Sequence, residues 1–152
     1  MIDARNQVLA ELEAVPERLA AAAEAADLLE REIPIDGWPA RLIVAHLALV
    51  ERVVWHRRLD DLAAAGSGRG PRWSHTEPGV GDGPGDATLA ELLDTFATAR
   101  AATVARVRAL DEDGLARHGV HDRFGRLDVV GLLREALRHD EEHVEELLAR
   151  AG

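Results

Sequence analysis

The sequence predicts an all-α protein, a four-helix bundle with one long connection between its helices. Apolar residues recur at heptad-like spacing through most of the chain, and no run alternates as a strand would for more than a few residues. Residues 66–87 interrupt this spacing with seven glycines and three prolines, so regular structure is not expected there. The length of 152 residues suits one domain of roughly 100–200 residues, and we expect residues 1–152 to form that domain.

The first two predicted helices lie before the long connection. Asp3 can cap the first helix, which runs to about residue 27. Pro16 inside it implies a kink or a restart, because proline removes a helical hydrogen bond. Pro39 suits the first position of the second helix, where the missing N–H is no loss. We expect this helix to continue through Ala40–Ala65 and to end at the glycine that follows.

The last two predicted helices follow the connection. Thr88 and Glu91 form a capping box, in which each side chain can bond the backbone N–H of the other residue. A third helix therefore starts there and ends near Leu110. A turn comes next, and residues 117–127 are predicted to be an irregular or extended link. Asp128 can cap a fourth helix that reaches nearly to the C-terminus.

The composition excludes several classes of chemistry. The chain has no cysteine and no lysine, and its only serines are Ser67 and Ser74 in the glycine-rich stretch. Disulfides, cysteine-ligated metals, thiol nucleophiles and a serine hydrolase triad are therefore not expected. The net charge of −10 repels the nucleic-acid backbone. No apolar run approaches the ~18 residues of a membrane span, and the N-terminus is unlike a signal peptide. We expect a soluble cytoplasmic protein that binds neither nucleic acid nor membrane.

One histidine is predicted to point into the bundle. On a wheel of the second helix with Leu42 at zero, His46 lies at roughly 40°, inside an apolar stripe that includes Leu49 and Val53. A buried imidazole must form hydrogen bonds or bind a metal. The position alone fits either a satisfied core histidine or a metal ligand.

Two further histidines are spaced for joint metal binding on the fourth helix. His139 and His143 stand at i and i+4, roughly 5–6 Å apart at Cβ, along one edge of its apolar face. A helical HxxxH pair is a metal-binding signal, although two solvent-facing histidines give the same spacing. With His46 on a helix packed ~8–10 Å away, three imidazoles could hold one ion through bonds of about 2.0–2.1 Å. Three neutral nitrogens with open positions are typical of a catalytic ion.

The remaining histidines are weaker candidates. His56 lies about 15 Å along the helix axis from His46, too far to share an ion. His75 in the loop and His118 in a turn are expected to be solvated. His121 is undecided, because the loop that carries it could fold over the site.

Three other side chains have two interpretations each. Asp140 lies on the apolar side of the fourth helix between the two histidines. It is either an exposed border residue or an acceptor that fixes an imidazole tautomer or ties down a neighbouring helix end. Arg57, facing inward, either holds an anionic substrate or reaches the surface along its aliphatic stem. Trp73 either anchors residues 66–87 as a functional lid or lies in a mobile loop.

Two motifs combine these residues. Trp38 is followed eight residues later by His46 in GWPARLIVAHLALVE, and an HDxxH motif starts at His139 in LLREALRHDEEHVEELL. Together they resemble the DinB-like (damage-inducible) superfamily, which includes the YfiT-type hydrolases. The similarity continues through LDEDGL at 110–115 and FGRLDVVGLL at 124–133, so it spans nearly the whole chain.

The resemblance has consequences for the site. It implies an antiparallel four-helix bundle, frequent homodimers and a divalent ion, zinc or nickel. Residue by residue, the metal triad of the family falls on His46, His139 and His143, which the helical wheels also select. Pro39 stands where the family commonly has a serine or threonine cap, which affects the start of the second helix and not the ligands.

Three functions remain open for a small-molecule site built on such an ion. Several characterised relatives are thiol transferases or thiol-dependent isomerases, so the resemblance favours a transferase that uses a low-molecular-weight thiol such as mycothiol, held as thiolate by the ion. The same ion could activate water in a hydrolase, with Asp140 or His121 as the only candidate bases. It could also brace the helices without catalysis. An apolar pocket above the metal would favour catalysis, and a closed site with a fourth protein ligand would favour bracing.

Overall fold

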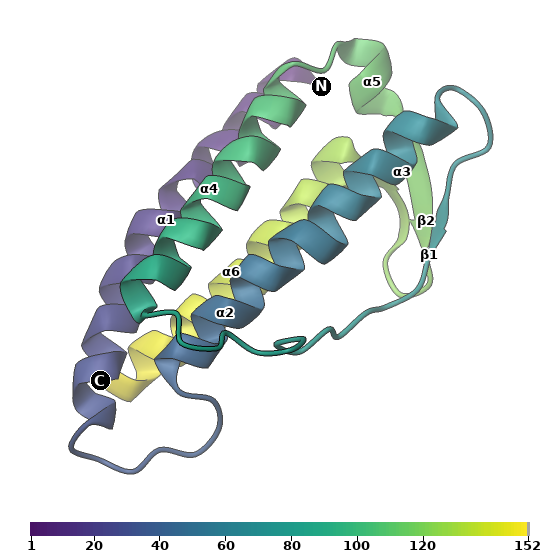
Figure 1. Ribbon diagram of the computed structural model, residues 1–152. Helices are drawn as coiled ribbons and strands as arrows, with labels where there is room; N and C mark the ends of the chain where they lie inside the picture. Colours follow the sequence, from purple (N-terminus) through teal and green to yellow (C-terminus); the bar gives the residue numbers. More distant parts are fainter. Residues whose placement is uncertain (152) are drawn as a thin grey trace.

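The computed structural model describes residues 1–151 and confirms the predicted bundle (Figure 1). Its four long helical segments are α1 (Ile2–Glu30), a composite of α2 (Ala40–Val50), η1 (Glu51–His56) and α3 (Arg57–Ala65), then α4 (Leu89–Arg108) and α6 (Val129–Ala151). Helix α1 packs against α4 and α6, and α2 packs against α4. None of the helices within the described part of the chain combines the length and apolar character that a membrane crossing needs.

Aliphatic side chains fill the interior between the four segments. Each segment contributes fully or nearly fully buried residues, among them Leu9, Leu12, Ile43, Leu47, Phe96, Leu132 and Leu147. Burying a side chain of this size stabilises the fold by about 1.5–3 kcal/mol relative to leaving it exposed. The core is therefore built mainly from helix faces, to which the small sheet adds Trp73 and Leu127.

Helix α1 is longer and simpler than the sequence suggests. Met1 rather than Asp3 is its N-cap, and the helix passes through Pro16 without a restart. Pro16 has no N–H for the carbonyl of Leu12 one turn earlier. The guanidinium of Arg100 on α4 donates to that carbonyl instead, at 3.2 Å from Nη1 to O. A long-range hydrogen bond thus replaces the helical one that the proline removes.

The second segment contains a π-helix that the sequence does not reveal. Residues Ala40–Ala65 are helical throughout, as predicted, with Pro39 as N-cap rather than first helical residue. Within it, Glu51–His56 form a π-helix. A π-turn holds one extra residue, so every later side chain rotates by roughly 100° from its α-helical position. Arg57, predicted to face inward, is therefore exposed, and Arg58 is buried in its place.

A small sheet flanks α3 (Figure 1). It consists of β1 (Arg72–Trp73), β2 (His118–His121) and β3 (Gly125–Asp128) in the order β1-β2-β3. Strand β1 pairs parallel to β2, and β2 pairs antiparallel to β3. The absence of strands in the predicted fold is thus corrected: β1 lies in the glycine-rich connection, and β2–β3 replace the expected link. These strands are too short for an alternating pattern to stand out in the sequence.

The predicted caps of the last two long helices are confirmed, but the second half of the capping box is not formed: Oε1 of Glu91 accepts from the Thr88 hydroxyl at 3.2 Å rather than from the Thr88 backbone N–H. The Thr88 hydroxyl accepts from the Glu91 backbone N–H, and the Asp128 carboxylate accepts from that of Gly131. The turn expected after Leu110 is instead a short helix, α5 (Glu112–Ala116), whose cap is Asp111. Hydrogen bonds of this kind can be predicted from the sequence because both partners lie within three residues of each other.

Candidate metal centre

Three imidazoles meet between α2 and α6. His46 is buried on α2, and His139 and His143 are half-buried on α6. Their ring centroids lie 4.8–5.2 Å apart. One nitrogen from each ring lies within 4.8 Å of the others, close enough to hold one metal ion. The residues that the sequence selects are therefore brought together. No fourth histidine, aspartate or glutamate within residues 1–151 joins the group.

The outer nitrogens of two rings are already engaged. Nδ1 of His46 lies 2.5 Å from the carbonyl oxygen of Gly79, and Nδ1 of His143 lies 3.1 Å from a carboxylate oxygen of Glu146. Both oxygens accept, so each Nδ1 carries the proton and donates it. The Nε2 lone pairs of His46 and His143 are consequently free to bind a metal. Such outer partners also orient metal-ligating histidines in known sites.

His139 has no partner of this kind. Its Nδ1 is buried without a hydrogen-bond partner among the described residues, which an ordinary core histidine avoids. Burial, with the neighbouring His143 and His46, lowers the pKa of His139 to about 4. Burial also lowers the pKa of His46, against the raising effect of the Gly79 carbonyl. At neutral pH both rings are therefore neutral, the form that a metal requires.

The spacing of the inner nitrogens suits a divalent ion. Nε2 of His46 and Nε2 of His139 lie 3.3 Å apart. Two nitrogens bound to one ion at about 2.0–2.1 Å are separated by roughly 2.8–3.0 Å in octahedral and roughly 3.3–3.4 Å in tetrahedral geometry. Trp38 packs edge-on against the His46 ring at 5.3 Å between centroids, which gives the first motif a physical role. The donor set and its spacing thus fit zinc or another divalent transition metal.

The glycine-rich connection covers this centre. Trp73 anchors it, because its ring is buried and its Nε1 donates to Asp61 at 3.1 Å. From there residues 74–87, which we call the strap, run past α2 to the start of α4 (Figure 1). The strap supplies the Gly79 carbonyl to His46, and the Arg41 guanidinium donates to the carbonyl of Ala87 at 2.7 Å. Trp73 is therefore an anchor of residues 66–87, and a lid function for this connection stays a prediction.

A glycine makes room for this anchor. A Cβ at Gly119 on β2 would lie 2.7 Å from the Trp73 ring, closer than real contacts allow. In the parallel register of β1 and β2, Trp73 pairs with His121. His121 is thereby placed at the edge of the site, as the folded-over loop hypothesis supposed.

A cavity of about 350 Å³ opens beside the triad, with His139 in its wall. The α2–η1 segment lines it with Val50, Val54 and Trp55. Other walls come from Arg58, the strap, the β2–β3 turn and α6. Pockets for small ligands typically have volumes of roughly 300–1,000 Å³ and mainly apolar walls with a few polar groups. The cavity therefore has the size of a small-molecule site, with polar and charged side chains in much of its wall.

Two histidines that are not in the triad lie in the cavity wall. His75, expected to be solvated, is half-buried, and its Nε2 lies 2.8 Å from Oε1 of Glu77. The hydrogen bond from His75 lowers the pKa of Glu77. His121 is buried, with Nδ1 accepting from the backbone N–H of Arg123 and of Phe124. His75 and Glu77 thus form an acid–base pair that the spacing of the sequence does not single out.

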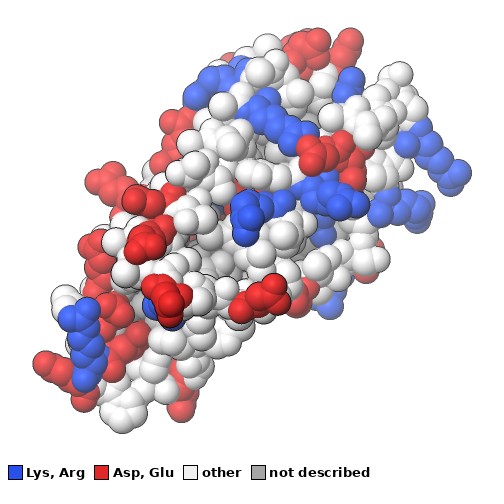
Figure 2. Space-filling model, viewed as in Figure 1, with Lys and Arg blue, Asp and Glu red and all other residues white. Residues whose placement is uncertain are grey.

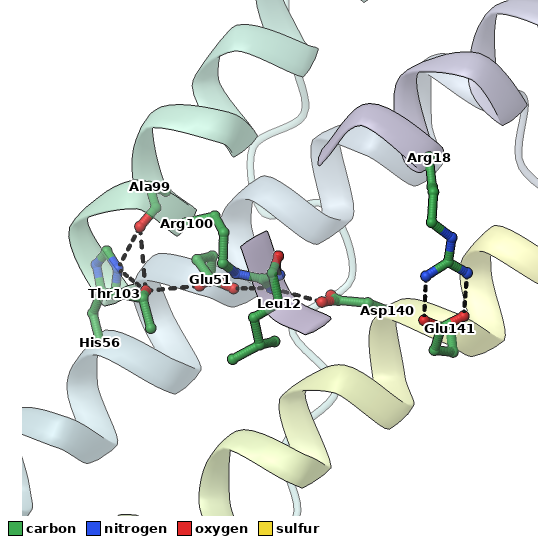
Figure 3. A network of polar contacts seen from close by, with 9 residues as sticks. All are labelled: Leu12, Arg18, Glu51, His56, Ala99, Arg100, Thr103, Asp140 and Glu141. Atoms are coloured by element: carbon green, nitrogen blue, oxygen red, sulfur yellow. Dashed lines mark hydrogen bonds and ion pairs between the residues drawn. The ribbon is translucent and has the colours of Figure 1, made fainter. Parts of the chain in front are cut away.

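Asp140 does not touch a histidine. It is buried and accepts from Nη2 of Arg100 at 2.7 Å, while Glu51 accepts from the same guanidinium at 2.8–2.9 Å (Figure 3). Neither the border position nor the tautomer-fixing role predicted for it is correct. It ties α6 to the middle of α4 rather than to a helix end. Burial raises the pKa of Asp140 to about 7. The positive charge of Arg100 opposes this rise, but Arg100 also pairs with Glu51.

The other two histidines lie outside the site. His56 donates from Nε2 to Thr103, whose hydroxyl contacts Glu51, so it extends the buried network (Figure 3). His118 begins β2, where its Nδ1 accepts from Arg126 at 3.2 Å. Both were predicted to be outside the metal site, and the structure does not bring either to the triad.

These features define a class of protein: a four-helix bundle with a three-histidine centre between two of its helices. The chain belongs to the DinB superfamily, whose family model matches residues 3–147. A comparison with curated proteins found no match. Among solved structures the chain is similar to YfiT from Bacillus subtilis, described as a probable metal-dependent hydrolase with an unusual four-helix bundle topology. The TM-score is 0.72 at 17% identity, over 97% of this chain and 85% of that one.

Proposed function

We propose that this protein is a metal-dependent hydrolase of a small molecule, with the ion held by His46, His139 and His143. The cavity carries the proposal, because His139 shares its wall with the His75–Glu77 pair. A divalent ion with open coordination positions supplies activation of a small nucleophile, water or a thiol. Water must lose a proton to become a strong nucleophile, so a nearby acid–base pair favours hydrolysis.

The His75–Glu77 pair has the features of a proton acceptor. Glu77 holds His75 through a 2.8 Å hydrogen bond, which orients the imidazole. The charge of Glu77 acts on His46 and His139, so the carboxylate lies within electrostatic range of the proposed ligands. Asp140 and His121, the bases considered from the sequence, are bonded elsewhere through Arg100 and through backbone N–H groups. The description of YfiT as a probable metal-dependent hydrolase agrees with this choice by analogy.

A thiol transferase is the second candidate. The chain has no cysteine or lysine, and neither of its serines lines the cavity, so any nucleophile must be brought in. A low-molecular-weight thiol such as mycothiol would meet this need, and the apolar wall of Val50, Val54 and Trp55 could take its electrophilic partner. A purely bracing ion is the least supported alternative, because the triad opens on a cavity.

A paired assay tests the choice. Zinc- and nickel-loaded protein is offered a panel of small esters and amides, and in parallel a panel of thiols with an electrophilic acceptor. We expect chelator-sensitive hydrolysis, and a fall in kcat of at least about 10²-fold in Glu77→Gln with unchanged metal content. Glu142→Gln is the matched control, because Glu142 lines the same cavity but pairs with Arg138. Metal-dependent thiol conjugation without hydrolysis would replace the proposal with the transferase.

A further inference from the structure

Arg58 is a buried cation without a carboxylate partner. It is 7% exposed, and within residues 1–151 no acidic oxygen lies within 4.0 Å of its guanidinium nitrogens. Of its five N–H donors, one reaches a carbonyl, that of Ser74, at 3.2 Å. The nearest acids that influence it are otherwise engaged: Asp61 accepts from Trp73, and Asp122 accepts from the backbone N–H of His75. A buried charge that lacks a counterion is costly.

Aromatic rings hold this guanidinium in place. Its carbon lies 5.4 Å from the centroid of Trp55 and 5.6 Å from that of Trp73. Cation–π contacts of this kind fix the plane of the side chain without using its N–H groups. The π-helix at Glu51–His56 decides that residue 58, and not 57, occupies the position. A rigid fork with free donors is the usual device for binding carboxylate or phosphate.

The fork lies in the wall of the cavity beside the triad. Arg58 and His139 line the same 350 Å³ space. The two other arginines of that wall are Arg123 and Arg138, and Arg138 is neutralised by Glu135 and Glu142. Although the chain carries a net charge of −10, Figure 2 shows basic side chains gathered near α3 and the strands, while acidic ones predominate along α1. The cavity wall itself holds three arginines against two acids, Glu77 and Glu142, a balance that favours an anion.

We propose that Arg58 binds a carboxylate or phosphate group of the substrate, so that the site selects small anionic molecules. The inference rests on the proposed function in taking this cavity as the substrate site. The anionic group occupies the end of the cavity walled by Trp55 and Arg58, and the rest of the molecule extends toward His139. Arg58 is a positioning residue for the reaction, and the bound anion supplies the counter-charge for Arg58 that the fold itself does not.

Calorimetric titration with matched probes tests this inference. Benzoate and phenyl phosphate carry the two anions, and benzamide is a neutral analogue of similar shape. Each is titrated into the zinc-loaded protein and again after chelator treatment, so that binding to the ion is separated from binding to Arg58. We expect one of the anions to bind at least about 10-fold more tightly than benzamide in both forms. The tighter of the two anions identifies the substrate group.

Two variants localise the effect. Arg58→Met should weaken anion binding at least about 10-fold, whereas the exposed neighbour Arg57→Met, with the same change in charge, should alter it less than about 2-fold. Metal content should be unchanged in both, so a failed metal site and a failed anion site give different results. If Arg58→Met does not fold, Arg58→Lys replaces it in the test. This variant keeps the charge but loses the planar fork, so its anion affinity should lie between that of the parent protein and that expected for Arg58→Met. Equal affinity for benzoate and benzamide, absence of binding, or equal affinity in Arg58→Met would overturn the inference.

Discussion

At the scale of single residues, hydrogen bonding distinguishes the proposed ligands from ordinary core histidines. His56 is satisfied by Thr103 and the Ala99 carbonyl, whereas Nδ1 of His139 has no partner within the described residues. The Nε2 atoms of His46 and His139 approach to 3.3 Å. A shared ion bound at these two atoms would account for that approach.

Metal content is expected to depend on His143 and not on His56. The protein should carry about one divalent ion per chain, and His143→Ala should lose most of it, because two remaining imidazoles hold an ion weakly. His56→Ala should keep the ion, since its ring lies in the buried network. Elemental analysis of the purified variants measures this. Equal metal content in both would remove the proposed site.

The free energy of unfolding is expected to depend on pH because Asp140 titrates. Burial raises its pKa from 3.8 to about 7. The folded protein therefore binds a proton more tightly than the unfolded chain, and stability falls as pH rises through the window from about 4 to 7. Asp140→Asn removes this loss and can keep the contact with Arg100. The free energy of unfolding of Asp140→Asn, relative to that of the parent protein, should therefore increase by roughly 2–3 kcal/mol between pH 5 and pH 8.

Urea unfolding at the two pH values measures that difference. Glu145→Gln is the matched control, because it removes one acid from the exposed face of the same helix. Its effect should be nearly independent of pH. A constant difference between Asp140→Asn and the parent protein across the window would show that Asp140 is ionised throughout.

At the scale of elements, two irregular features position the site. The π-helix rotates the second half of the α2–α3 segment so that Arg58 enters the cavity. The strap brings Gly79, His75 and Glu77 over the ends of the triad. Irregular helix turns are frequent at functional sites, and both features here lie beside the same cavity.

The buried arginine network holds these elements in register. Arg100 on α4 bonds Leu12 on α1, Glu51 on η1 and Asp140 on α6 (Figure 3). Asp140 directly follows the proposed ligand His139, so the network also fixes the helix that carries it. One side chain thereby contacts all the other long segments of the bundle.

Removing this arginine is expected to be strongly destabilising. Arg100→Met leaves two acids buried without their counter-charge and the Leu12 carbonyl without a partner, at a cost of about 3–5 kcal/mol. Arg18→Met is the control, because Arg18 forms an exposed ion pair with Glu141 at 2.6 Å, which contributes about 0–1 kcal/mol. Denaturant unfolding compares them. Similar losses in the two variants would contradict a structural role for the network.

At the scale of the whole molecule, the core does not depend on an ion. The apolar faces of α1, α2, α4 and α6 bury one another along the bundle, and the triad lies between only two of these helices. Chains of this length usually bury enough apolar surface to fold unaided, unlike zinc fingers.

Chelation is therefore expected to lower the melting temperature while leaving the helical circular dichroism at 25 °C largely intact. Binding of the ion stabilises the folded state by mass action. Its removal therefore lowers the free energy of unfolding only by this binding contribution. A chelated His143→Ala variant serves as control, because it should show no further change. Loss of most of the helical signal would mean that the ion is structural and would revive the bracing alternative.

The sequence by itself determined the helices and the residues that could form a metal site. Apolar periodicity, the caps at Thr88 and Asp128, and the i, i+4 spacing of His139 and His143 depend on partners within a few residues, so they can be recognised before folding. His46 could be placed with them because its position on the helical face does not depend on the later π-turn.

Only the tertiary structure decided how the site is enclosed and what it can recognise. The contacts of Gly79 with His46, of Trp73 with the sheet, and of Arg100 with Asp140 join residues 33 or more positions apart. The burial of Arg58 depends on one extra residue in a helical turn, which no local propensity signals. Charged residues are generally expected at the surface because water solvates them best, and for Asp140 the sequence left an exposed and a hydrogen-bonded position open. The structure buries both Asp140 and Glu51. Their burial depends on Arg100, a partner that comes within reach only when the helices pack.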